Sequence, residues 1–331
     1  MEIIFHIGMG KTGTSSIQRA LRDNPDTLKA SGAHYIGLWF DTINEQFSGL
    51  SGTKKFLSSS AAQMQEYAAE FHRKLAGIRN AEGSFRFILS NEAIFQSAEA
   101  ILPFLNKLVE DGDSKIKVIA YMRNPADWIL SAYSQWGINH KTSTGPIPSI
   151  QEFAPSLLSQ YDATKHWIAD FRGTLDIRAF DPSKDVITDF GQAIGVELKP
   201  LPQKILARSE LAELILRREF NNSFSTEILP KVFDEVVLGS SRSEVETLDD
   251  IVSSIFDPDA VSEMIQSKSS LWSEIKKEVG IDLTEEHNRD PMPDKDDLRD
   301  RLLEYLIVLT MKQSKRIFNL ELKMKGFEKT S

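Results

Sequence analysis

Short apolar runs alternate with helical periodicity over the first 200 residues of the chain. The runs predict strands, and apolar residues three or four positions apart predict the helices between them. Strands are expected at 2–7, 85–90, 116–122 and 174–180. Helices are expected at 14–24, 61–80, 97–110, 125–137, 149–170 and after Asp185. One buried face of the second helix would carry Met64, Ala68, Phe71 and Leu75. The alternation predicts an α/β fold, with a central parallel sheet flanked by helices and right-handed crossovers.

The pattern changes after Pro200-Leu201-Pro202, where only helical periodicity continues. Helices are expected there at 206–222, 243–256, 259–278 and 294–323. We therefore expect an α/β core over 1–200 and a helical extension packed on that core over 201–331. Residues 37–60 combine glycine and serine with aromatic side chains. They predict an irregular segment, either a mobile lid that faces an acceptor or an ordinary surface loop. Trp272 belongs either to the core or to an acceptor mouth.

A glycine-rich turn follows the first strand directly, in the run His6-Ile7-Gly8-Met9-Gly10-Lys11-Thr12-Gly13-Thr14-Ser15-Ser16. Its glycines allow backbone N–H groups to approach an anion. Lys11 adds a positive charge, and the hydroxyl residues can open a helix and donate hydrogen bonds. The loop of nucleoside triphosphatases and kinases needs a glycine, four residues, and then Gly-Lys-Ser/Thr. Phe5 stands where that first glycine would be, so the spacing disfavours a kinase.

A second pattern that suits an anion follows the strand expected at 116–122. Arg123-Asn124-Pro125 comes after its end, and Ser131 lies eight residues beyond Arg123. Pro125 has the backbone angle of a first helical turn. A guanidinium group can donate two parallel hydrogen bonds to one phosphate. The side chain of Arg123 is therefore suited to hold a phosphate group.

Together, Lys-Thr-Gly-Thr-Ser-Ser and Arg-Asn-Pro-x-Asp-x-x-x-Ser resemble the donor-binding sequences of bacterial-type sulfotransferases. These enzymes use 3′-phosphoadenosine-5′-phosphosulfate (PAPS) and release 3′-phosphoadenosine 5′-phosphate (PAP). The resemblance covers about residues 1–200, including 175–181, and implies a P-loop-like fold with no required metal. It implies that the donor is held by Gly10, Lys11, Thr12, Gly13, Thr14, Ser15, Ser16, Arg123 and Ser131, with Lys11 also catalytic. The basic C-terminal segment of the family is not recognisable here, and Arg208, Arg217 and Arg218 are possible substitutes.

The reaction that this resemblance implies needs a base for the acceptor. Glu92 follows the strand expected at 85–90, at the edge of the sheet where ligands bind in open α/β folds. Relatives place a histidine or glutamate at this strand end, so the resemblance implies Glu92 as catalytic base. A first-turn helix glutamate stabilised by the helix dipole is the structural alternative. His34 is its main rival, and His140 a weaker one that, with Lys141, could contact the acceptor.

The composition of the chain limits the classes of partner that we expect it to bind. The chain has 331 residues, 39 Lys and Arg against 48 Asp and Glu, a net charge of −9, and no cysteine. The acidic balance disfavours nucleic-acid binding, and the sequence shows no membrane span or signal peptide. We expect a cytoplasmic enzyme that binds a nucleotide donor and transfers its sulfuryl group to a hydroxyl or amine of a carbohydrate or small molecule. A P-loop-like kinase and a non-catalytic nucleotide-binding protein on the same fold remain alternatives.

Overall fold

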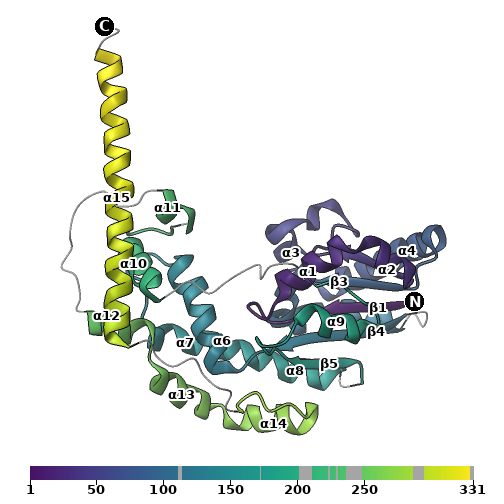
Figure 1. The fold of residues 1–331 in the computed structure, drawn as a ribbon. Helices are drawn as coiled ribbons and strands as arrows, with labels where there is room; N and C mark the ends of the chain where they lie inside the picture. The colour runs from purple at the N-terminus through teal and green to yellow at the C-terminus, as the bar shows by residue number, and fades with distance from the viewer. Residues whose placement is uncertain are drawn as a thin grey trace. The chain divides into compact units, whose positions relative to one another are not determined.

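Five parallel strands form the central sheet of this computed structural model (Figure 1). They are β1 (Glu2–His6), β2 (Ala33–Gly37), β3 (Arg86–Ser90), β4 (Lys115–Met122) and β5 (Leu175–Ala179). Their spatial order is β2-β3-β1-β4-β5, which confirms the α/β fold expected from the alternation. The structure describes residues 1–110, 114–171, 173–200, 211–222, 224–228, 230–235, 248–285 and 294–328.

Helices connect the strands, as crossovers between parallel strands usually require. In the first 200 residues these are α1 (Thr14–Asp23), α2 (Pro25–Ala30), α3 (Gly49–Leu57), α4 (Ala61–Glu82), α5 (Ala98–Glu110), α6 (Pro125–Ala132), α7 (Ile150–Leu158), α8 (Ala163–Phe171) and α9 (Val186–Ile194). Short 3₁₀ segments lie at Glu45–Phe47, Glu92–Ser97 and Ser159–Asp162, and a π-helical segment at Tyr133–Asn139. The later helices are α10 (Leu211–Asn222), α11 (Pro230–Glu235), α12 (Leu248–Ile255), α13 (Pro258–Ser267), α14 (Ser269–Val279) and α15 (Lys295–Glu328).

Side chains that alternate along the strands build a core on each face of the sheet. On one face, Ile4 and Ile88 pack with residues of α1 and α9, such as Ile17 and Phe190. On the other face, Phe5 meets Phe104 of α5 edge to face, with ring centroids 6.5 Å apart. The predicted stripe of α4 (Met64, Ala68, Phe71 and Leu75) is buried, as the periodicity required.

The segment 37–60 differs from both sequence interpretations. It contains α3, and its aromatic side chains Phe40, Phe47 and Phe56 are fully buried. Phe40 and Phe56 stack with centroids 3.9 Å apart, and both contact Phe104. The segment therefore contributes aromatic residues to the core, because their burial outweighs the turn preference of its glycines and serines.

Several boundaries also differ from the sequence prediction. Strand β2 and helix α2 were not predicted. Helix α1 ends at Asp23, close to the predicted end of the helix at 14–24, and Pro25 then occupies the first turn of α2. The helix expected at 125–137 changes to a π-helical segment after Ala132. The helices expected at 149–170 and 259–278 are each divided into two.

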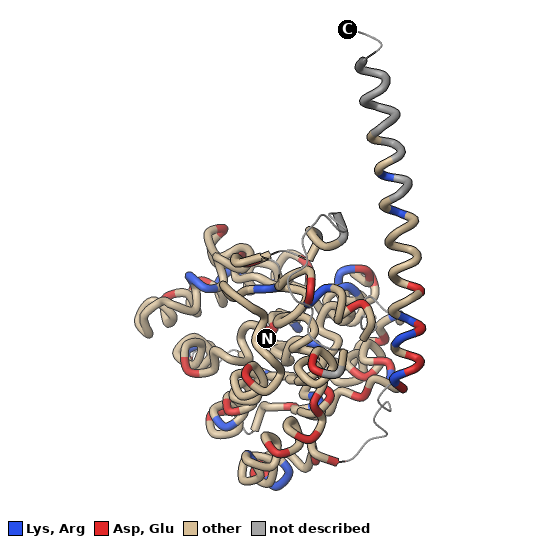
Figure 2. The backbone as a smooth tube through the Cα atoms, turned by 90° about the vertical axis from the view of Figure 1, so that its left-hand side faces the viewer, with Lys and Arg blue, Asp and Glu red and all other residues tan. Residues whose placement is uncertain are grey.

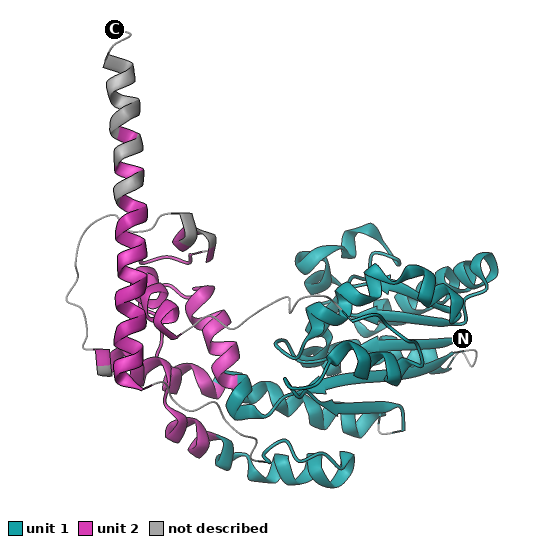
Figure 3. Ribbon diagram, viewed as in Figure 1, with its two compact units in different colours: residues 1–128, 156–207, 265–285 teal, residues 129–155, 208–264, 286–331 magenta. Residues whose placement is uncertain are grey.

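The described chain forms two compact units, shown in Figure 3. The first contains the sheet and comprises residues 1–128, 156–207 and 265–285. The second is helical and comprises residues 129–155, 208–264 and 286–331. This division differs from a single boundary at residue 200, because α14 returns to the first unit and residues 129–155 belong to the second. Trp272 of α14 is buried against Tyr161 in the first unit, so it belongs to the core, one of the two places that the sequence left open.

Candidate functional site

Three predicted site segments follow three neighbouring strands of the sheet. Strand β1 lies between β3 and β4, with His6 level with Ser90 and Ile119. The glycine-rich loop therefore leaves the carboxyl end of β1 beside Asn91-Glu92, and Arg123 follows β4. Ligands of open parallel sheets bind at this edge. The topology places Lys11, Glu92 and Arg123 on one edge of the first unit.

The loop after β1 is a short turn held by internal hydrogen bonds. Lys11 has φ 66°, the one positive φ of a non-glycine residue in the described part of the chain. Gly13, at φ 83°, precedes α1 and occupies its N-cap position. The Thr12 hydroxyl is buried and donates to the Met9 carbonyl. From α6, the Trp128 indole Nε1 donates to the Gly10 carbonyl at 2.7 Å. These bonds fix the course of the loop before any ligand binds.

The backbone N–H groups of residues 10–15 have no acceptor among the described residues. The first intrahelical bonds of α1 are those from Ser16 and Ile17 to the Gly13 carbonyl. Orphan N–H groups at a helix start, together with the positive end of the helix dipole, favour an anion. These N–H groups are therefore available to an anion, and the anion-binding role of the loop stays a prediction.

Three charged side chains interact electrostatically beside the loop. Burial and the Arg123 guanidinium lower the pKa of Lys11, while the Glu92 carboxylate acts in the opposite direction. Burial raises the pKa of Glu92, which the hydroxyl of Thr14 and the charge of Lys11 partly offset. The Glu92 side chain reaches solvent, yet the surrounding protein removes enough water to disfavour its ionised form. Two cations and one carboxylate thus share one partly desolvated site.

The four predicted hydroxyl ligands of the loop have different environments. The Thr12 hydroxyl donates its proton to the Met9 carbonyl. The backbone N–H is therefore the only hydrogen-bond donor that Thr12 can offer a ligand. The Thr14 hydroxyl is buried next to Glu92 and has no well-formed hydrogen bond to any described residue. Ser15 is exposed and Ser16 half-exposed. Ser15 and Ser16 therefore have the hydroxyl groups best placed to meet a ligand from solvent.

Glu92 is positioned by the residue before it. Asn91 accepts a hydrogen bond from the Ala93 N–H at 2.9 Å and so caps the 3₁₀ segment that Glu92 begins. Its side-chain amide donates to the Leu38 carbonyl at 2.8 Å, and its own N–H donates to the His6 carbonyl. These contacts fix the end of β3 and hold the Glu92 backbone at the sheet edge.

Arg123 is held at its backbone and flanked by an aromatic ring. Its carbonyl accepts a hydrogen bond from the Tyr161 hydroxyl at 2.7 Å. Its guanidinium carbon lies 5.6 Å from the centre of the Phe180 ring. Asn124 caps the following helix by accepting from the Ala126 N–H, and Pro125 begins α6 as predicted. Ser131 lies on α6 beyond the point where the chain enters the second unit, so its pairing with Arg123 stays a prediction.

Sequence reasoning missed His6, a supporting residue beneath the loop. His6 is fully buried, and its Nδ1 lies 2.7 Å from the Ser90 hydroxyl. A Cβ atom on Gly8 would lie 3.2 Å from the His6 Nε2. That Nε2 has no hydrogen-bond partner among the described residues, and burial lowers the pKa of His6 to about 3. The sequence feature that could have identified His6 was its position in an otherwise apolar strand.

The other candidate bases lie elsewhere. His34 is level with Phe87 near the start of β2, and its Nδ1 pairs with Glu82 at 3.0 Å. His140 ends the π-helical segment in the second unit. Lys141, expected near the acceptor, is buried with its ammonium on the carbonyls of Asn221 and Phe224. Lys141 therefore closes the end of α10 rather than meeting an acceptor.

The arginines considered as substitutes for a basic C-terminal segment have contacts of their own. Arg217 pairs with Glu213 at 2.7 Å and lies over the Phe233 ring. Arg218 is buried and pairs with Glu219 at 2.7 Å. Both belong to the second unit, and Arg208 lies outside the described residues. Acidic neighbours already meet the charges of Arg217 and Arg218, which weakens their assignment to the donor.

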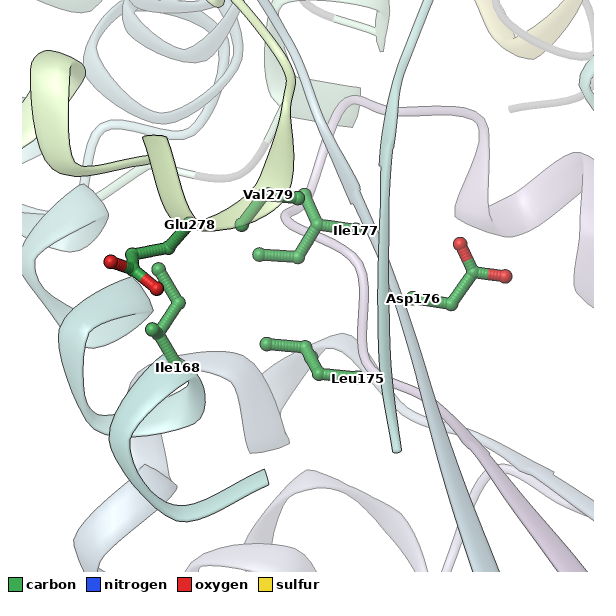
Figure 4. A pocket seen from close by; sticks show the side chains of 6 residues that line it. All are labelled: Ile168, Leu175, Asp176, Ile177, Glu278 and Val279. Carbon is green, nitrogen blue, oxygen red and sulfur yellow. The ribbon is translucent and has the colours of Figure 1, made fainter. Parts of the chain in front are cut away.

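A cavity of about 180 Å³ in the first unit contains none of the predicted site residues. It lies among β5, α8 and α14, and is lined by Ile168, Leu175, Asp176, Ile177, Glu278 and Val279. Figure 4 shows Leu175 and Ile177 pointing toward Ile168, while the Asp176 carboxylate points to the other side of β5. The lining residues include two acidic residues and no Lys or Arg, so the cavity offers no cation to an anionic donor.

No group of three His, Asp or Glu side chains that could hold a metal ion occurs within the described ranges. No helix in those ranges combines the length and apolar composition that crossing a bilayer demands. Comparison with known proteins yields no match to a family model, and no curated protein matches the chain.

Proposed function

We propose that this protein is a PAPS-dependent sulfotransferase that transfers a sulfuryl group to a hydroxyl or amine acceptor. The main support is the electrostatic coupling of Lys11 with Arg123 and Glu92, at the ends of three adjacent strands. A cation pair suits a donor with two anionic groups, and a carboxylate beside it suits proton removal from an acceptor. The acceptor class that we propose is a carbohydrate or another small molecule.

The loop would hold the 5′-phosphosulfate of the donor. The N–H groups of residues 10–15 lack acceptors in the described structure, and Lys11 adds a charge beside them. At the start of α1, Ser15 adds an exposed hydroxyl donor and Ser16 a half-exposed one. Arg123 would bind the 3′-phosphate with Ser131. A 3′-phosphate is absent from ATP, so this second anchor would select PAPS over a triphosphate.

The spacing of the loop supports this choice over a kinase. The first glycine of a triphosphate loop would have to stand at position 5. Phe5 lies inside β1 and is fully buried against Phe104. The turn therefore begins later and is shorter than the loop that wraps a β- and γ-phosphate.

Glu92 would act as the base. Its raised pKa makes it a stronger proton acceptor than a glutamate with the ordinary pKa. The proton of the acceptor passes to a Glu92 oxygen, the acceptor atom bonds to sulfur, and the bond from sulfur to the 5′-phosphate oxygen breaks. PAP leaves with that electron pair. Lys11 and the loop N–H groups are placed to stabilise the charge that grows on the leaving oxygens.

The direct test is calorimetric titration with PAP and with ATP, followed by transfer of labelled sulfate from PAPS to a panel of sugars and alcohols. We expect PAP to bind more tightly than ATP. Arg123→Ala should weaken PAP binding about 10- to 100-fold, the value of a lost charge-assisted hydrogen bond. Lys29→Ala removes an exposed lysine and serves as the matched control. Equal binding of ATP with magnesium-dependent phosphoryl transfer would establish a kinase instead.

The base is tested separately once turnover is found. Glu92→Gln keeps the size of the side chain and removes its proton affinity, so kcat should fall about 10²- to 10⁴-fold. Glu66→Gln, at an exposed position of α4, is the control and should keep full activity. Unchanged turnover in Glu92→Gln, with PAP binding intact, would remove the base role but keep the donor site.

A further inference from the structure

Trp39 is the aromatic residue of segment 37–60 that the core does not absorb. Phe40, Phe47 and Phe56 of the same segment are fully buried, whereas Trp39 is half-buried. The Trp39 indole makes no hydrogen bond and no ring contact with any described residue. Core packing therefore explains the three phenylalanines of the segment and leaves Trp39 without an assigned role.

The other tryptophans of the first unit have the contacts of structural residues. All of them are buried, and each donates its indole N–H to a backbone carbonyl: Trp128 to Gly10, Trp167 to Phe95 and Trp272 to Ile265. A buried indole N–H usually finds such a partner. Trp39 has neither the burial nor the hydrogen bond, so its N–H is available to a ligand.

The backbone is held on both sides of Trp39. The Leu38 carbonyl accepts a hydrogen bond from the Asn91 side-chain amide at 2.8 Å. On the other side, the buried Phe40 ring stacks on Phe56 with centroids 3.9 Å apart. Trp39 therefore has a defined place in the chain although its own ring has no polar contact. A side chain on a fixed backbone loses little freedom on binding, which favours affinity.

A break in the register of β2 lies just before Trp39. Tyr35 is level with Ile88, but Gly37 is level with Leu89, so β2 has one extra residue at this point. Gly37 has φ 119°, and a Cβ atom there would meet nothing within 4 Å. Glycine thus suits the backbone conformation here rather than a lack of space. Bulges of this kind occur next to binding sites, where they redirect the side chains that follow.

The chain reaches Trp39 at the same sheet edge as Glu92. Strand β2 is the neighbour of β3, and the bond between Asn91 and Leu38 joins the residues that precede Glu92 and Trp39. The glycine-rich loop and Arg123 follow β1 and β4, on the other side of β3. Along the edge, Trp39 and the proposed donor ligands therefore lie on opposite sides of Glu92. This is the order that an acceptor, its base and the donor require.

The surroundings of Trp39 favour an uncharged sugar ring. A pyranose presents C–H groups on one face, which suit the electron-rich face of an indole, and hydroxyl groups around its rim. Asp41 is exposed and Thr42 half-exposed just after Phe40, and both can bond to hydroxyl groups. Figure 2 shows Lys and Arg interspersed with Asp and Glu along the described backbone. A polyanionic acceptor would instead favour an extended basic surface.

We propose that Trp39 is the stacking surface for an uncharged sugar ring of the acceptor and holds one of its hydroxyl groups next to Glu92. The proposal rests on the proposed function, because it takes Glu92 as the base. The hydroxyl proton passes to Glu92, and the hydroxyl oxygen forms the bond to sulfur as the bond to the 5′-phosphate oxygen of the donor breaks. Trp39 takes no part in the bond changes and acts only by binding the ring.

Sugar binding is tested by ¹⁹F NMR of the full chain labelled with 5-fluorotryptophan. The chain has 5 tryptophans, and the resonance that is missing from Trp39→Phe belongs to Trp39. The probes are the methyl glycosides of glucose, galactose, mannose and N-acetylglucosamine, and then phenol, each with and without PAP. The Trp39 resonance should shift saturably with at least one glycoside while the others stay in place. No saturable shift of Trp39 with any glycoside, or a shift with phenol alone, overturns the proposal.

The kinetic test uses the glycoside that shifts Trp39 as acceptor for sulfate from PAPS. Trp39→Ala should raise the KM of this acceptor about tenfold, because the apolar face of the ring loses its cover, with kcat and PAP affinity nearly unchanged. Trp39→Tyr keeps an aromatic ring and should restore most of the lost affinity. Leu50→Ala removes an apolar side chain that is 73 % exposed in the same segment, and as the matched control it should keep the wild-type KM.

The results separate this proposal from the proposed function. If PAP binds and sulfate is transferred but Trp39→Ala keeps the wild-type KM, the sulfotransferase function stands and the role of Trp39 is overturned. If the Trp39 resonance shifts with a glycoside but the wild type neither binds PAP nor transfers sulfate, the proposed function fails and the sugar site at Trp39 remains.

Discussion

Acidification should destabilise the first unit through His6. This histidine is fully buried, and burial lowers its pKa from 6.5 to about 3. Below pH 6.5 the unfolded chain binds a proton at His6 that the folded chain does not. Stability must therefore fall as the pH falls from 6.5, and the loss is complete only near pH 3.

The magnitude follows from the two pKa values. Between them, stability changes by about 1.4 kcal/mol per pH unit. Lowering the pH from 7.5 to 5 should therefore cost about 2 kcal/mol through His6 alone. Solvent cannot screen this effect, because the ring is fully buried between Tyr121 and Phe190.

The assay is urea unfolding at pH 7.5, 6.5, 5.5 and 5 for the wild type and for His6→Asn. The asparagine amide can keep the hydrogen bond to Ser90 but cannot take up a proton. Its fixed packing cost cancels when the two pH dependences are compared. The wild type should lose about 2 kcal/mol more than the variant between pH 7.5 and 5. His166→Asn, at a half-exposed pair with Glu99, should follow the wild type. Parallel pH curves for wild type and His6→Asn would refute the reasoning.

Three further changes test the loop and its surroundings. Thr14→Val removes the hydroxyl that lowers the pKa of Glu92, so the acid limb of kcat/KM should move to higher pH in a pH–rate profile of sulfate transfer; an unmoved limb would contradict the contact. Gly13→Ala places a Cβ 2.8 Å from Val186 at φ 83° and should cost about 1–3 kcal/mol in thermal unfolding. Gly77→Ala, in an open position of α4, should instead stabilise by about 0.5–1 kcal/mol, and equal effects would show that the loop is not strained. Trp128→Phe loses the N–H bond to the Gly10 carbonyl and should weaken PAP binding about tenfold by calorimetry, whereas unchanged binding would mean that the loop holds its course without it.

The local sequence was enough to predict those strands and helices in which the pattern of apolar residues matches the pattern of buried residues. Phe87, Ile88 and Leu89 form a short apolar run and lie fully buried in β3. Segments stabilised from a distance were harder to predict. Phe40 and Phe56 lie in a stretch rich in glycine and serine, and their place in the core depends on Phe104, far along the chain. No local pattern contains that contact.

The same distinction applies to the site. Lys11, Glu92 and Arg123 could be selected because each directly follows an apolar run, and parallel strands end at a common edge. The residues that hold the loop in place could not be predicted in the same way. The bond of Thr12 to Met9 and the contact of Trp128 with Gly10 depend on the exact course of the turn. Thr12 therefore serves the loop itself, although its residue type suggested a ligand.

The backbone of Lys11 gives a physical reason to assign chemistry to its side chain. A left-handed conformation costs a non-glycine residue about 1–2 kcal/mol, and glycine would avoid that cost. The loop has glycine at positions 8, 10 and 13, so the strained position is the one that carries a side chain. Burial and Arg123 add an electrostatic cost by lowering the pKa of that lysine. Neither cost improves folding, and an anion at the loop would relieve the repulsion between Lys11 and Arg123. Strain and charge together therefore favour a loop arranged for a ligand over an ordinary strand-to-helix connection.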